Sequence, residues 1–166
     1  MTVELVDEQR EPVDHERLRA LAEHVLAAEG VPARMALAVR CVDRDAIAAL
    51  NREHMDGQGP TDVLAFPLDD PAALDPEDPV PALLGDVVLC PAVAREQAAG
   101  EPLAELELLL VHGILHLLGH DHAEEHERHV MFARTDALLA AFRASDAAGG
   151  TLGGTAGGTA EGRERS

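Results

Sequence analysis

The chain has 166 residues, 46% of them hydrophobic, and carries a formal net charge of −18. A chain of this length usually forms one domain and buries a sizeable core without help from disulfides. The acidic balance disfavours a general binder of nucleic acids or of anionic membranes, because phosphate contacts need a basic surface. With no Trp, no Tyr and only three Phe, the chain also lacks the aromatic platform typical of RRM and OB domains.

The cysteine content and the apolar runs bear on the cellular compartment. Two cysteines, Cys41 and Cys90, do not make a disulfide framework. Residues 1–10 are acidic rather than a basic segment followed by an apolar one, and no apolar run reaches the length of a membrane span. We therefore expect a cytoplasmic protein that has no membrane partner.

Hydrophobic periodicity predicts strands and helices over most of the first 144 residues. The predicted elements run, in chain order: strand 2–6, helix 15–29, strand 35–42, helix 44–54, strand 62–66, strand 85–90, and helices 91–99, 102–118 and 123–144. Asp14 and Asp43 supply the caps of the first two helices, and Gly30 and Gly100 end the first and the third. The helix over residues 102–118 is apolar nearly all round and should lie in the middle of the protein.

These elements predict an α/β or α+β fold, in which a small mixed sheet of about four strands is packed by about five helices. Residues 69–81 hold five acids, four prolines and no base, so we expect a solvated loop that forms no helix. Residues 144–166 consist largely of Ala, Gly and Thr and are predicted to be a disordered tail. The single domain is therefore expected to span residues 1–143.

The segment HGILHLLGHDH, residues 112–122, contains the chemically informative side chains. His112 and His116 are four residues apart, so a helix presents both imidazoles on one face, where they can share a metal ion. Gly119 can end the helix and turn the chain back, which allows His122 to supply a third ligand. Three imidazoles and an open position describe a catalytic zinc site, although nickel or copper would compete for such ligands. We expect one zinc ion per chain, because three unpaired imidazoles on an apolar helix would be costly to bury.

The same histidine spacing occurs in metzincin peptidases, where a Glu beside the first His is the general base. Here that position is Gly113, so a peptidase would need its base from elsewhere. The polar residues between the ligands are His120 and Asp121. Asp121 either orients a ligand imidazole and transfers protons or caps the following helix. His120 is expected near the ligands rather than as a fourth ligand, which would close the site.

At this point the sequence resembles the YbeY family of metal-dependent endoribonucleases, which mature ribosomal RNA. The motif of residues 112–122 fits the family signature H-G-x-L-H-L-x-G-x-D-H at every fixed position. The segments Leu50-Asn51, PTDVLAFP at 60–67 and LLGDVV at 83–88 resemble other family segments in the same order. The resemblance covers roughly residues 35–140 and implies that His112, His116 and His122 bind zinc.

Two departures from the family pattern concern catalysis. The family Arg that follows the Leu-Asn pair falls on Met55, whose thioether cannot neutralise a phosphate, and Arg52 is a candidate to replace it. A family Ser is Ala65 in this chain. An acidic protein can still bind RNA if several arginines gather in one basic cleft. The candidates are Arg34, Arg40, Arg44, Arg52 and Arg95.

The resemblance implies a zinc-dependent, single-strand-specific endoribonuclease that acts in maturation of the 3′ end of small-subunit ribosomal RNA and in ribosome quality control. Asp121, His120 and Arg52 are its candidate catalytic residues. The expected partners are precursor ribosomal RNA and the small subunit or its assembly factors, with no DNA. The alternatives are a zinc-dependent peptidase or other hydrolase, and a non-catalytic ribosome-assembly factor with a structural zinc.

Overall fold

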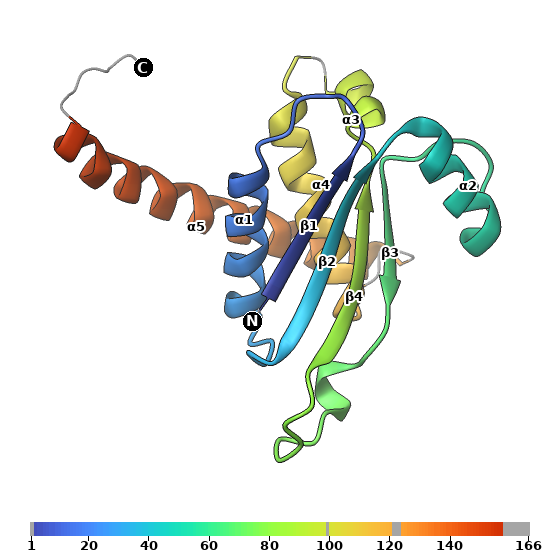
Figure 1. Cartoon of the computed structure of the whole chain (residues 1–166), viewed down its shortest axis with the longest axis horizontal. Coiled ribbons are helices and arrows are strands. Elements are labelled where there is room, and N and C mark those ends of the chain that lie inside the picture. The colour runs from blue at the N-terminus through green and yellow to red at the C-terminus, as the bar shows by residue number, and fades with distance from the viewer. Residues whose placement is uncertain (1, 99, 121–123, 158–166) are drawn as a thin grey trace.

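The computed structural model describes residues 2–98, 100–120 and 124–157 and has a four-stranded sheet at its centre (Figure 1). The strands are β1 (Thr2–Glu8), β2 (Met35–Val42), β3 (Val63–Pro67) and β4 (Ala82–Leu89). The sheet order is β1-β2-β4-β3, with β1, β2 and β4 parallel and β3 antiparallel to β4. The predicted mixed sheet of about four strands is therefore confirmed.

Five α-helices accompany the sheet in the described residues, as the periodicity predicted. They are α1 (His15–Ala28), α2 (Arg44–Met55), α3 (Pro91–Gln97), α4 (Pro102–Leu117) and α5 (Glu125–Gly157). Buried residues of α1, α4 and α5 form the main core with one face of the sheet, whereas α2 packs on the other face in a smaller cluster. No helix in the described ranges is long and apolar enough to cross a membrane.

The first two helices begin where the sequence placed their caps. The side chain of Asp14 accepts a hydrogen bond from the Arg17 backbone N–H at 3.1 Å, and Asp43 accepts one from Ala46 at 2.9 Å. Each cap satisfies a backbone donor that has no partner inside its helix. The chain leaves α1 through Gly30, whose φ of 73° belongs to the left-handed region that glycine adopts without strain.

Helix α4 lies at the centre of the molecule, as predicted. It contacts α1, α3 and α5 on the helical side and β3 and β4 of the sheet. Most of its apolar residues are buried, and Leu110, Ile114 and Leu115 are completely inaccessible to solvent, whereas Leu103 in its first turn is exposed. A helix in this position orients every side chain on its surface relative to the rest of the fold, including both histidines of residues 112–116.

One buried carboxylate joins three helices, and the hydrophobic pattern gave no sign of it. Glu107 of α4 is 5% exposed and accepts hydrogen bonds from Arg17 of α1 and, at 3.0 Å, from Arg143 of α5. A buried carboxylate is costly unless it is paired, and here two guanidinium groups supply the pairing. The contact ties α1 and α5 to the central helix.

Three boundaries differ from the sequence predictions. The loop over residues 69–81 contains one 3₁₀ turn, Pro71–Ala73, because proline is compatible with the first position of a helix. Strand β4 begins at Ala82 rather than at residue 85, because Met35 and Ala36 of β2 continue to pair with it. Helix α5 continues past residue 144 to Gly157. A disordered tail over 144–166 stays a prediction, and residues 158–166 lie outside the described residues.

The two thiols provide a test of burial in the core. Cys41 and Cys90 are both fully buried, and burial raises the pKa of Cys41 from 9.0 to about 12 and raises the pKa of Cys90. A raised pKa in the folded state means that stability is complete below about pH 9 and falls as the pH rises towards 12. Because the chain has no Tyr and no Lys, no other side chain titrates in this window.

We predict that titration of Cys41 lowers the free energy of unfolding by about 1–2 kcal/mol between pH 8 and pH 10.5. Urea denaturation at the two pH values measures this difference. In Cys41→Ala the part of this pH dependence that comes from Cys41 should disappear, whatever the free energy of unfolding of the variant at pH 8. An unchanged pH dependence in Cys41→Ala would show that this thiol does not control alkaline unfolding.

Candidate metal centre

Two of the three predicted metal ligands lie one turn apart on α4. His112 and His116 are both half-buried, although the residues around them on the helix are fully buried. Positions four apart project from the same face of a helix, so both imidazoles are oriented towards one region.

Helix α4 ends in a turn that reverses the chain after the second histidine. The backbone N–H of Gly119 donates to the His116 carbonyl at 3.0 Å, and that of His120 donates to the Leu115 carbonyl at 2.9 Å. This pair of bonds is a Schellman motif, and it requires the left-handed conformation that Gly119 adopts with a φ of 98°. The predicted role of Gly119 is therefore confirmed.

The third predicted ligand, His122, and the candidate catalytic residue Asp121 lie outside the described residues. Their roles stay predictions. Within the described ranges, no group of three or more potential ligand side chains is close enough to hold a metal. The two imidazoles of α4, followed by a chain reversal at Gly119, three residues before His122, fit the donor set of a three-histidine zinc site.

Gly113, the residue after the first histidine, faces the sheet and not the histidine side of α4. A Cβ built at this position would lie 2.6 Å from Cγ1 of Val87 on β4 and 3.4 Å from Cγ2 of Val63 on β3. The backbone of α4 therefore approaches the sheet too closely for any larger residue without movement. A glutamate base at the metzincin position is excluded by packing in this fold, which weakens the peptidase alternative further.

His120 lies beside the end of α1. Its Nε2 is 3.8 Å from an oxygen of Glu29, and Glu29 also accepts a hydrogen bond from Arg134 of α5 at 2.6 Å. The imidazole is 26% exposed, so it is open to solvent on one side. Its catalytic role stays a prediction, and its observed contact is with a carboxylate of another helix.

Phe132 is a neighbour of the site that the sequence did not reveal. Its ring centroid lies 5.3 Å from that of His112, with the two planes tilted by 35°. The residues belong to different helices, so no spacing in the sequence relates them. Only the packing of α5 on α4 brings the two rings together.

Most of the five candidate arginines are paired with other groups of the protein. Arg40, Arg44 and Arg95 are each in ion pairs, with Glu8 at 3.1 Å, Glu96 at 2.7 Å and Glu11 at 2.7 Å respectively. Arg34 donates to backbone carbonyls of the acidic loop. A paired guanidinium offers less charge to a phosphate. The gathering of the five arginines in one basic cleft stays a prediction.

Arg52 is the exception among the five, since its guanidinium makes neither an ion pair nor a hydrogen bond with the described residues. It is exposed near the end of α2 and lines a cavity of about 340 Å³ together with residues 56–59. Asn51 organises this loop by donating from Nδ2 to the Gly59 carbonyl at 3.1 Å. A Cβ at Gly57 would lie 2.3 Å from the Asn51 side chain, so glycine is needed for the loop to close on it. The loop leads into β3, whose first residue is the Val63 that packs near Gly113.

The two departures from the family pattern have different surroundings. Met55 is 44% exposed at the end of α2, three residues after Arg52, so the two side chains lie on neighbouring parts of the helix surface. Ala65 of β3 is half-buried and packs against the main core. Because the Met55 thioether carries no charge, Arg52 is the candidate for contact with a phosphate at this end of α2.

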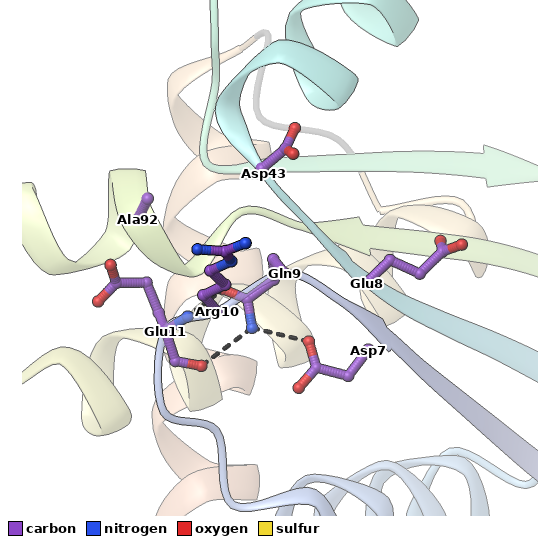
Figure 2. Close-up of a pocket in the computed structure, with 7 residues that line it drawn as sticks. All are labelled: Asp7, Glu8, Gln9, Arg10, Glu11, Asp43 and Ala92. Carbon is purple, nitrogen blue, oxygen red and sulfur yellow. Dashed lines mark hydrogen bonds between the residues drawn. The ribbon is translucent and has the colours of Figure 1, made fainter.

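A cavity of about 500 Å³ lies at the carboxyl ends of β1 and β2 (Figure 2). Figure 2 shows Gln9 donating to the side chain of Asp7 and to the backbone carbonyl of Glu11. Four of the lining residues are acids and one is Arg10. A mostly anionic lining repels phosphate, so this cavity is a poor candidate for RNA.

Comparison with known proteins gives a consistent family. The model of the family described as Endoribonuclease YbeY matches residues 4–143. An Endoribonuclease YbeY from Nocardioides sp. is 50% identical over 149 residues, covering 87% of this chain and 99% of its own length. One from Acidothermus cellulolyticus is 51% identical over 152 residues, covering 87% and 93%. A solution structure of a Thermotoga maritima protein, 24% identical, has a TM-score of 0.59 and covers 98% of this chain and 99% of its own.

The family model and both relatives describe one class of enzyme, a hydrolytic nuclease. The chain belongs to the Endoribonuclease YbeY family, because the match spans most of its length and the identity reaches 50%. The resemblance seen in the sequence is therefore confirmed. The likeness to the Thermotoga maritima structure supports the fold.

The contact at Gly113 predicts the effect of adding a single methyl group. Gly113→Ala should destabilise the fold by about 1–3 kcal/mol, because overpacking outweighs the roughly 1 kcal/mol gained in helix propensity. Chemical denaturation measures the loss. Combining it with Val87→Ala should recover part of that loss, since the added methyl group then fills the space left by valine. Strictly additive effects of the two substitutions would argue against the contact.

Proposed function

We propose that the protein is a zinc-dependent, single-strand-specific endoribonuclease that acts in maturation of the 3′ end of small-subunit ribosomal RNA and in ribosome quality control. Family membership and the pair of half-buried histidines on α4 support this proposal. The geometry that contributes most is the Schellman turn after His116, which reverses the chain before His122. The proposed partners are precursor ribosomal RNA and the small subunit or its assembly factors, in the cytoplasm.

In this proposal His112, His116 and His122 hold one zinc ion. When bound, zinc supplies Lewis acidity towards water and towards the phosphoryl oxygens of the substrate. Asp121 transfers protons, and His120 contributes a second titratable group at the turn. The apolar packing around α4 fixes the helix in the core, so the two helical histidines keep their directions before a metal binds.

Arg52 is proposed to contact a phosphate of the RNA. Its guanidinium makes no ion pair with the described residues, whereas Arg40, Arg44 and Arg95 are paired with carboxylates. Attraction between one guanidinium and a polyanion has to act against a net charge of −18. RNA binding should therefore be weak and strongly reduced by salt.

The decisive experiment compares the wild type with His116→Ala. Elemental mass spectrometry should find about one zinc per chain in the wild type and much less in the variant. Cleavage of single-stranded RNA should be lost together with the metal, since one of three ligands has been removed. His129→Ala is the matched control, because His129 is exposed on α5 and its ion pair, at 4.0 Å, is with Glu125.

Contaminating nucleases are excluded by preparing all three proteins identically. RNA cleavage that persists in His116→Ala would refute the proposed site. Zinc without any cleavage in the wild type would favour the non-catalytic assembly factor.

Arg52→Ala should retain zinc but cleave RNA less efficiently. The expected loss is roughly 10- to 100-fold in kcat/KM, because a hydrogen bond to a charged group contributes about 1.5–3 kcal/mol. Arg40→Ala removes the same charge from a paired site and should change kcat/KM much less. Equal losses in the two variants would mean that net charge, and not a contact made by Arg52, controls binding.

A further inference from the structure

Phe132 is a large aromatic side chain in an unusual position. It is 44% exposed on α5, although the chain has no Trp and no Tyr and only three Phe. The residues of α5 that face the core are Met131, Thr135, Leu138, Leu139 and Phe142, all buried. Phe132 stands beside this buried face and leaves a large part of its ring accessible to solvent.

The ring of Phe132 is held against a predicted metal ligand. Its centroid is 5.3 Å from that of His112 with a tilt of 35°, so one part of the ring is fixed by the histidine. Val130, two residues earlier, is similarly exposed at 47%. Side chains that are two residues apart on a helix point in directions about 200° apart around its axis. Val130 therefore does not lie on the surface that Phe132 occupies.

The other two phenylalanines do not offer a comparable surface. Phe142 is 6% exposed and packs against His24, with Arg17 over its ring. Phe66 belongs to the second cluster and contacts His54 edge-on. Phe132 is therefore the one phenylalanine that combines an exposed ring with a contact to the candidate metal centre.

We propose that Phe132 binds the substrate directly by stacking on one RNA base next to the phosphodiester bond that is cleaved. This inference rests on the proposed function, since it takes His112 as a ligand beside the reacting phosphate. Every base has a π-face, so such stacking is tolerant of sequence and requires an unpaired base. It therefore accounts for a preference for single-stranded RNA without an extended aromatic platform.

The stacking role differs from a purely structural one in which Phe132 shields His112. Shielding requires an apolar side chain and is indifferent to whether the RNA carries bases. Stacking requires an aromatic ring and a base. The two roles are therefore separated by comparing a base-bearing oligonucleotide with an abasic one of the same length and charge.

Because the chain has no tryptophan, Phe132→Trp introduces a fluorescent reporter at this position. Its emission should be quenched by a single-stranded 2′-O-methyl oligoribonucleotide and much less by the abasic oligomer. Val130→Trp is the matched control and should respond to neither. Gel electrophoresis after the titration checks that the oligonucleotides are intact.

Phe132→Ala supplies the second readout in the full-length, zinc-loaded protein. It should weaken binding of the base-bearing oligomer roughly 5- to 150-fold, the range expected for one stacked base, and leave binding of the abasic oligomer unchanged. Val130→Ala should affect neither. Zinc content should equal that of the wild type, and Phe132→Trp should bind as well as the wild type.

Three results would overturn the inference: equal quenching by the two oligomers or none, unchanged binding in Phe132→Ala, or loss of zinc from that variant, which would assign Phe132 to shielding His112. The proposed function is tested separately by cleavage. A base-dependent signal from Phe132→Trp, together with a wild type that cleaves no RNA, would retain the stacking contact and refute the nuclease mechanism. Normal cleavage by the wild type without a base-dependent signal from Phe132→Trp would refute the stacking contact and retain the nuclease mechanism.

Discussion

The close approach of α4 to the sheet is the constraint on which the rest of the structure depends. At Gly113 the helix comes so near Val87 that a single added carbon would lie 2.6 Å from a valine methyl group. This approach fixes the rotation of α4 about its axis. Once Gly113 faces the sheet, the helical period places His116 about 60° and His112 about 100° around the axis from that contact, one turn apart from each other. The same packing that closes the core thus sets the direction of the candidate metal ligands.

The net charge of the chain does not show which of its arginines are already paired with other groups. Most of the described arginines are paired with carboxylates or backbone carbonyls, and two of them neutralise the buried Glu107 that joins α1, α4 and α5. Two of the four acids that line the cavity at the carboxyl ends of β1 and β2, Glu8 and Glu11, are themselves paired with Arg40 and Arg95. Arg52 can still contact a phosphate, because it is exposed near the end of α2. It lies beside the loop of residues 56–59, whose conformation depends on the contacts of Asn51 with Gly57 and Gly59. Local pairing, more than net charge, therefore decides which arginine can meet a phosphate.

The candidate site combines elements of different rigidity. Helix α4 is held on all sides by apolar contacts, so the positions of His112 and His116 vary little. The loop of residues 56–59 depends on a few hydrogen bonds to Asn51 and is exposed. Such an arrangement suits a hydrolase, in which ligands must be oriented in advance while the substrate enters from solvent.

The sequence by itself determined the elements, the caps at Asp14 and Asp43, the turn at Gly119 and the family. These depend on local periodicity, local hydrogen bonds and a contiguous motif, all of which are visible in neighbouring residues. The ion pairs of Arg40, Arg44 and Arg95, the buried Glu107 and the contact of Phe132 with His112 were decided by the tertiary structure. Each of them joins segments far apart in the chain, and their side chains meet only after the helices have packed on the sheet.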